Sequence, residues 1–341
     1  MGGKRMFSFC IAALSMVVLI LDGETALISA SEGIEICIKT VIPSLFPFFF
    51  LSVIINQALA GMRSPILRPL TRLCGLQEGT ESVLLLGLLG GYPVGAASVS
   101  LAYSSGNIGL AQAQRMLSFC NNAGPAFIFG MMSALFDNKA VCWAIWGIHI
   151  LSAVAVGGIL PRIESKNCDL PQKAPLTVTQ ALKQAVSNIS VVCGWIVVFR
   201  IVYGFCSRWF LWLLPENVQV FLCGILELAN GCISLSTISD AGIRFMMATV
   251  FLSFGGICVG MQTVSVIGQL SVKTYWQGKL MQTAITLLFA EIMQHFLFPE
   301  EALRMEILLC LPGIVVLLYP IIKKAVAFPK IMRYNRENSL R

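Results

Sequence analysis

Residues 82–103, SVLLLGLLGGYPVGAASVSLAY, form an apolar stretch that is long enough to cross a membrane but is interrupted at its middle. Three glycines and a proline stand within six of these residues, and such a cluster breaks a helix. Backbone groups freed at membrane depth must be buried in protein or line a cavity. The stretch therefore predicts a re-entrant helical hairpin whose tip is formed by Gly91, Tyr92 and Pro93.

The chain as a whole has the composition of a polytopic membrane protein. Of its 341 residues, 57% are hydrophobic and 12% are charged, and the mean hydropathy is +0.80. Soluble domains have about 45–50% apolar and about 25% charged residues. The net charge of +7 comes from basic residues between apolar runs, which is typical of membrane-protein loops and not of nucleic-acid binding. The 12 cysteines form no C-x-x-C pair, so we expect no disulfide framework and no zinc site.

Hydropathy divides the chain into ten apolar segments. They lie near residues 6–21, 41–60, 82–103, 116–136, 140–160, 184–206, 218–238, 245–268, 280–298 and 305–322. The segment 218–238 carries Glu227, Asn230 and Gly231 at its centre, and we interpret it as a second hairpin. The pattern predicts an all-α polytopic membrane protein with about eight transmembrane helices plus two re-entrant helical hairpins.

The first apolar segment follows Lys4 and Arg5, as the apolar part of a signal peptide does. The stretch Ile28-Ser29-Ala30 is a poor cleavage site because it begins with a bulky residue. We therefore interpret the segment as an uncleaved signal anchor, with a cleaved signal peptide as the alternative.

The loop charges indicate how the segments are oriented. If each hairpin returns to the side from which it enters, most of the 24 lysines and arginines fall inside, among them Arg115 and Lys279. This distribution obeys the positive-inside rule. It predicts a multi-pass protein of the cell membrane with both termini cytoplasmic, whose basic tail lies against anionic lipid.

The same orientation predicts an inverted-topology repeat. Each half runs as a span, a hairpin, a glycine-interrupted span and a further span, in opposite directions, which is typical of secondary transporters. The predicted organisation comprises a signal-anchor helix with an amphipathic segment (1–40), a first repeat (41–160), a cytoplasmic linker (161–179), a second repeat (180–300), a final transmembrane helix (301–322) and a basic cytoplasmic tail (323–341).

The stretch SFCNNAGP, from Ser118 to Pro125, is the most specific candidate for a binding site. Asn121 and Asn122 are costly in an apolar span unless they find partners. Gly124 ends one helix and Pro125 begins the next, whose free N–H groups and positive dipole end suit a polar solute. The alternative is hydrogen bonding between helices around a kink, with no ligand.

The two hairpin tips supply further candidates. Gly91, Tyr92 and Pro93 are expected to contact the solute, unless they only form a tight turn packed against its neighbours. Glu227 is the candidate for binding a coupling ion, a proton or sodium, because an acid at membrane depth is rare and functional by default. Asn230 lies three residues further on the same helical face and is expected to contact solute. The alternative for Glu227 is a carboxyl near the membrane surface or one held neutral by a partner.

Arg200 and Glu291 are the other ionisable residues at depth. We expect them to form a structural ion pair, with contact between Arg200 and an anionic solute as the alternative. Glu291 also precedes His295 by four residues, a spacing that suits a proton relay. A buried histidine with satisfied hydrogen bonds is the plainer interpretation of His295, and also of His149.

Motifs of catalysis are absent from the sequence. It contains no G-x-x-x-x-G-K-[ST], no H-E-x-x-H and no G-x-S-x-G. We therefore predict a protein that is not an enzyme and that holds no cofactor and no metal.

Three stretches resemble the sporulation integral membrane protein YlbJ family. They are IPSLFPF at 42–48, GGYPVGA at 90–96 and FCNNAGPAFI at 119–128. That family belongs to the nucleoside recognition (Gate) domain group, which takes its name from similarity to concentrative nucleoside transporters and to the gates of the ferrous-iron transporter. The resemblance covers about residues 35–320, and the second half matches only by pattern.

The resemblance implies a transporter-like fold with two hairpins and a role in forming the spore cortex, in the mother-cell or forespore membrane of a Gram-positive spore former. The nucleoside transporters have a Gln-Thr-Glu-type tip where this chain has Gly91, Tyr92 and Pro93, so the resemblance supplies no substrate. We predict a secondary transporter of a small polar or anionic solute. The alternative is a non-transporting scaffold that recruits cortex-forming machinery. The expected partners are membrane lipid, the solute, a coupling ion and, as in many inverted-repeat transporters, further copies of the chain.

Overall fold

The computed structural model describes residues 2–58, 64–163 and 177–298, and every regular element in these ranges is helical. The all-α class is thereby confirmed. Five helical runs in these ranges are long and apolar enough to cross a membrane: Gly23–Ile55, Lys139–Ile159, Val178–Trp209, Ala241–Val266 and Val272–Leu297. They support a multi-pass membrane protein. The expected final span at 305–322 and the basic tail at 323–341 lie outside the described residues.

The helices fall into two halves on either side of residues 164–176. The first half contains α1 (Gly2–Leu21), α2 (Gly23–Ile36), the π-helical turn η1 (Cys37–Val41), α3 (Ile42–Ala58), α4 (Arg68–Leu73), α5 (Glu81–Leu89), α6 (Val94–Ser104), α7 (Leu110–Leu117), α8 (Pro125–Met132) and α9 (Lys139–Ile159). The second half contains α10 (Val178–Trp209), η2 (Leu211–Leu213), α11 (Glu216–Leu226), α12 (Leu228–Ser234), η3 (Leu235–Thr237), α13 (Ala241–Phe254), α14 (Gly256–Val266) and α15 (Val272–Leu297).

The helix that contains the first internal span begins earlier than the hydropathy pattern suggests. Asp22 separates α1 from α2, and its carboxylate accepts a hydrogen bond from the Thr25 amide at the start of α2. The chain then continues through η1 into α3 without a cap or a gap. The structure therefore moves the start of this span from residue 41 to Gly23, and residues 23–40 are not a separate amphipathic segment.

Both predicted hairpins turn back on themselves. α5 and α6 pack side by side, and the tip between them contains Gly91, with φ of +85°, and Pro93, which precedes the first turn of α6. α11 and α12 form the second pair and turn at Glu227, whose backbone is extended (φ −143°, ψ 120°). A Cβ added to Gly231 would overlap the backbone of Gly224, so the two helices of this pair make close backbone contact.

Two further helices are interrupted near their middle. The first break, residues 118–124, lies between α7 and α8, and Pro125 is the first residue of α8 as its sequence position predicts. The second break lies between α13 and α14 at Gly255 and Gly256, which have φ of +83° and +76°. Such positive φ values suit glycine because it has no Cβ.

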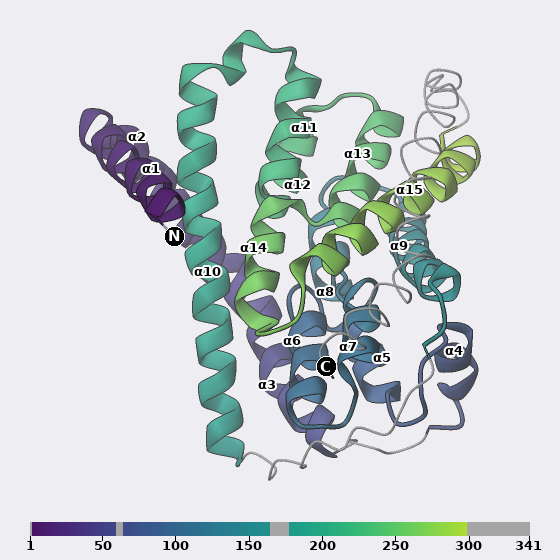
Figure 1. The fold of residues 1–341 in the computed structure, drawn as a ribbon. Helices are drawn as coiled ribbons and strands as arrows, with labels where there is room; N and C mark the ends of the chain where they lie inside the picture. The colour runs from purple at the N-terminus through teal and green to yellow at the C-terminus, as the bar shows by residue number, and fades with distance from the viewer. Residues whose placement is uncertain (1, 59–63, 164–176, 299–341) are drawn as a thin grey trace.

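The hairpins lie at opposite ends of the molecule (Figure 1). The α5–α6 pair lies at the end where α10 begins, and the α11–α12 pair lies at the end where α10 finishes, so the two tips point toward the middle. α2, α3 and α10 pack together along one flank. α10 begins at a capping box formed by Thr177 and Gln180, and its 32 residues extend roughly 48 Å. This flank and the two tips enclose the candidate site.

Two basic residues that the charge pattern assigns to inside loops are buried instead. Arg115 is 4% exposed, and its guanidinium donates to the carbonyls of Gly157 (2.7 Å), Pro161 (2.9 Å) and Leu160 (3.1 Å) at the end of α9. Lys279 is 0% exposed within α15. Loop counting did not show that either side chain is packed, because hydropathy records a charge without recording which face of a helix is packed.

Candidate functional site

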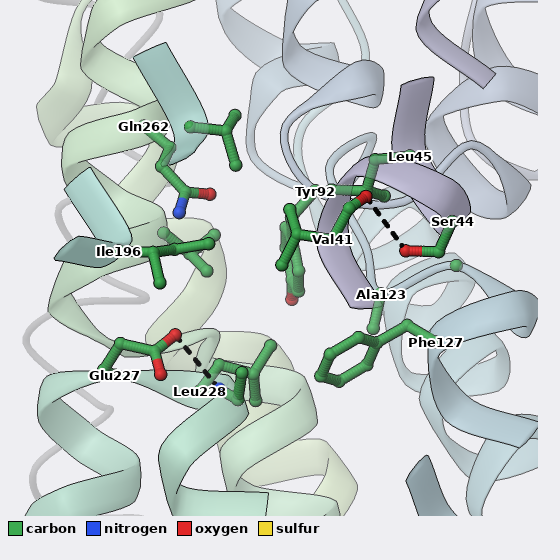
Figure 2. A pocket seen from close by; sticks show the side chains of 14 residues that line it. Val41, Ser44, Leu45, Tyr92, Ala123, Phe127, Ile196, Glu227, Leu228 and Gln262 are labelled. Atoms are coloured by element: carbon green, nitrogen blue, oxygen red, sulfur yellow. Dashed lines mark hydrogen bonds between the residues drawn. The ribbon is translucent and has the colours of Figure 1, made fainter. Parts of the chain in front are cut away.

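A small pocket lies where the two hairpin tips, the first helix break and α14 meet α3 and α10 (Figure 2). Ile196 of α10 and Gln262 of α14 line it from one side, and Ser44 of α3 and Phe127 of α8 line it from the other. Most of the other lining side chains are apolar. Among the lining residues of the described chain, Glu227 is the one with a charged side chain.

Glu227 occupies the turn between α11 and α12 and is 2% exposed. Its Oε1 accepts a hydrogen bond from the Ala229 amide at 3.0 Å. Its Oε2 accepts from the Asn230 amide at 2.7 Å and from Asn230 Nδ2 at 2.8 Å. The carboxylate thus caps the start of α12, where a negative charge is stabilised. The structure places Asn230 against Glu227, not on the pocket wall.

The remaining polar groups of the pocket are neutral. Gln262 donates its side-chain amide to Cys258 Sγ at 3.3 Å, and Ser44 donates its hydroxyl to the Thr40 carbonyl at 2.7 Å. Gly124 precedes α8 and provides no side-chain cap, and it lines the pocket together with Phe127 of the first turn of α8. The arrangement suits a small molecule with an apolar body and a few polar groups.

Tyr92 connects the pocket to a buried polar network, which we call the α15 network and which consists of Tyr92, Asn122, His149, Lys279 and Gln282. The Tyr92 hydroxyl donates to the Leu252 carbonyl at 2.8 Å and accepts from Lys279 Nζ at 2.9 Å. Lys279 also donates to Gln282 Oε1 at 2.7 Å, and Gln282 donates to Asn122 Oδ1 at 2.8 Å. His149 Nε2 accepts from the Ala123 amide at 3.0 Å. The network ties the first tip and the first break to α15.

Asn121 and Asn122 are both 0% exposed, and they hold the first break in place. Asn122 Nδ2 donates to the carbonyls of Gly87 (2.9 Å) and Phe119 (2.7 Å). Asn121 Nδ2 donates to Thr263 Oγ1 at 2.9 Å, and its Oδ1 accepts from the Ala96 amide at 3.3 Å. Neither asparagine is among the residues that line the pocket.

The predicted pair between Arg200 and Glu291 is not formed. Arg200 Nε donates to Glu32 Oε2 at 2.9 Å and so links α10 to α2. Glu291 lies on α15 with its Oε1 3.7 Å from His295 Nε2, four residues along the same helix. Arg200 pairs with Glu32 because α2 packs against α10. The hydropathy pattern had placed Glu32 outside the membrane spans.

The predicted tip residues take different positions. Gly91 lies against the first break, where a Cβ added to it would be 3.4 Å from the Gly124 amide nitrogen. Tyr92 and Gly124 line the pocket, Pro93 caps α6 and Pro125 begins α8. The structure thus gathers Tyr92, Gly124 and Glu227 around one pocket and uses the asparagines to support it.

Sequence reasoning missed three residues near the site: Lys279, Gln282 and Gln262. Lys279 and Gln282 are three residues apart in an apolar run, and this spacing places polar groups on one helical face. This spacing could have indicated a buried polar face, but the count of loop charges assigned Lys279 to an inside loop. Gln262 carries no comparable signal. Among the described residues, no group of three or more His, Cys, Asp or Glu side chains is arranged to hold a metal ion.

The fold and the pocket define a multi-pass, all-helical membrane protein with interrupted helices around a buried cavity. Among known proteins, the chain is similar to the sporulation integral membrane protein YlbJ of Bacillus subtilis (strain 168). The two are 23% identical over 316 residues, which cover 78% of this chain and 76% of the relative. This similarity confirms the resemblance to the YlbJ family that the motifs indicate. No family model and no solved structure matches the chain.

Proposed function

We propose that the chain is a secondary transporter that binds a small polar solute in the pocket beside Glu227 and acts in endospore formation. The observation that carries the proposal is the position of the pocket, which is lined by two hairpin tips, the first helix break and α14. Broken helices around a central site are typical of transporters that work by alternating access. The sporulation role rests on the name of the Bacillus relative.

We propose further that the two halves are inverted repeats and that the hairpins are re-entrant. In each half a hairpin tip touches the break of the following helix. A Cβ on Gly124 would lie 3.1 Å from Gly91, and a Cβ on Gly256 would lie 3.4 Å from the Leu228 amide nitrogen. The hairpins approach from opposite ends of the molecule (Figure 1). Equivalent contacts in opposite directions are what an inverted repeat of the Gate type entails.

In this proposal Glu227 has a structural role and a binding role. Its carboxylate fixes the start of α12, and it presents a negative charge to the solute or to a coupling ion, a proton or sodium. Asn121 and Asn122 act indirectly, because they hold the first break in the shape that the pocket requires. Both termini are proposed to lie in the cytoplasm, because the distribution of lysines and arginines then obeys the positive-inside rule.

The proposal is tested by filling the pocket. Ile196→Trp places a large side chain in the cavity, and Glu227→Gln removes its charge, in a spore-forming host whose own copy is replaced. We expect both variants to reach the membrane and to lose heat-resistant spores by at least tenfold. Val191→Trp, on the exposed side of α10, is the matched control and keeps the wild-type count. A full spore count in both pocket variants contradicts the proposal.

The same variants separate transport from a scaffold role. A scaffold that recruits cortex-forming machinery needs its loops and basic tail and does not need the pocket. It therefore predicts normal spores with Ile196→Trp and lost spores on deletion of residues 323–341. Thermal stabilisation of the purified chain by nucleosides, peptidoglycan precursors, amino acids or metal ions would then identify the solute class, because a ligand at 100 times its dissociation constant adds about 2.7 kcal/mol.

A further inference from the structure

We infer that the pocket takes an organic solute with an amino group or another N–H donor on an apolar body, and that it rejects small carboxylates. This inference rests on the proposed function, because it names the solute class of the same pocket. The sequence predicts a polar or an anionic solute, and the inference keeps the polar solute and excludes the anionic one.

The charge around the pocket is negative. Among the lining residues of the described chain, Glu227 is the one with a carboxylate side chain, and Arg200 does not line the pocket. Arg200 already donates to Glu32. When all three side chains are ionised, this group carries one uncompensated negative charge. An anion brought beside it would meet repulsion that is stronger than in water because the site is buried.

The hydrogen-bonding groups of the pocket are mainly acceptors. Among the described residues, the Glu227 carboxylate accepts one hydrogen bond at Oε1 and two at Oε2, so Oε1 retains acceptor capacity. Gln262 donates one N–H to Cys258 Sγ, and its carbonyl oxygen can accept a hydrogen bond from a ligand. Ser44 commits its hydrogen to the Thr40 carbonyl and so also offers oxygen lone pairs. These groups match N–H donors.

Two features that would favour an anion do not offset this charge. Lys279 is buried nearby, but it does not line the pocket, and its Nζ is bonded to Tyr92 and Gln282 in the α15 network. The uncapped start of α8 adds N–H groups, which suit an oxygen of the same solute but carry no full charge. The Ala123 amide beside it is already taken by His149.

The apolar lining requires a solute that carries hydrocarbon as well as a positively charged group. Val41, Phe127, Ile196 and Val259 present hydrocarbon and one aromatic ring to the cavity. An organic ammonium places its charge at Glu227 and buries its carbon atoms against these side chains, with added attraction where the charge approaches the ring of Phe127.

The test compares three probes with the same branched skeleton: isobutylamine, isobutyl alcohol and isobutyrate. Thermal unfolding of the purified full-length chain is measured with each probe at equal concentration and ionic strength. We expect isobutylamine to raise the unfolding temperature, the alcohol to raise it less and isobutyrate to have no effect. Glu227→Gln weakens the apparent affinity for isobutylamine at least tenfold, whereas Glu35→Gln, an exposed acid paired with Lys39, leaves it unchanged.

Ile196→Trp supplies a second test in which the carboxylate stays in place, and it also abolishes the isobutylamine shift. Three outcomes overturn the inference: a shift with isobutyrate equal to that with the amine, an amine shift that survives both pocket variants, and no shift with any probe. If Ile196→Trp nevertheless removes heat-resistant spores, the proposed transport stands and only the solute class is wrong.

Discussion

The two hairpin tips differ in how the polar side chains beside them are hydrogen-bonded. At the first tip, Tyr92 and the neighbouring Asn122 have their polar atoms bonded within the α15 network. At the second tip, Glu227 caps α12 and keeps acceptor capacity at the wall of the pocket. A polar group with all its partners supplied by protein stabilises the fold, whereas one with a free acceptor position is available for a ligand. The first tip is therefore a structural joint, and the second tip is the one that we propose contacts the solute.

The largest expected effect concerns the packing of the first break. A Cβ on Gly278 of α15 would overlap the Ser118 carbonyl, which is backbone and has little room to move. We expect Gly278→Ala to lower the free energy of unfolding by about 3 kcal/mol or to prevent folding. Thermal unfolding in detergent measures the change.

The matched control is Gly147→Ala in α9, where an added Cβ meets nothing within 4 Å. Its stability should be unchanged or higher by roughly 0.5–1 kcal/mol, because alanine favours a helix over glycine. If Gly278→Ala unfolds at the same temperature as this control, the first break is not a tightly packed joint.

Removing Asn122 should have the next largest effect. Asn122→Ala removes the side-chain donor to the Gly87 and Phe119 carbonyls and one of the two acceptors of Gln282 Nε2. We expect a loss of about 2 kcal/mol in the free energy of unfolding. Ser190→Ala, which removes an exposed hydroxyl on α10, is the control. An unchanged stability together with lost solute binding would reverse the roles assigned to the two tips.

Glu227→Gln should lower stability less but affect function more. The amide retains one acceptor oxygen yet loses the charge that favours the start of α12, so we expect about 1 kcal/mol of destabilisation. Binding of isobutylamine should fall at least tenfold. Measuring unfolding and binding on the same sample separates the two effects. A large loss of stability with intact binding would make the second tip the structural joint.

The smallest effect is expected at the pair between Arg200 and Glu32. Their side chains are 20% and 45% exposed, and we expect a coupling of less than about 1 kcal/mol in a double-mutant cycle of Arg200→Met and Glu32→Gln. Arg200→Met should leave isobutylamine binding unchanged, because Arg200 does not line the pocket. Weaker amine binding in this variant would show that Arg200 contributes to solute binding.

The sequence alone determined the class of the protein and the positions of its helix breaks. Apolar runs fix the helical class, since backbone groups in lipid must be satisfied within each segment. Gly91, Pro93 and Pro125 mark interruptions through local backbone chemistry, which needs no knowledge of neighbours. Glu227 was recognisable as a candidate because an acid in an apolar run requires an explanation.

Only the tertiary structure decided what each polar side chain does. Asn122 and Lys279 become parts of a joint because α15 packs across the first break, and Arg200 meets Glu32 because α2 packs on α10. Partners that lie more than a hundred residues apart leave no trace in local spacing. Whether a polar group is satisfied by protein or left for a ligand depends on those partners, and this is why the pocket beside Glu227 emerged only from the fold.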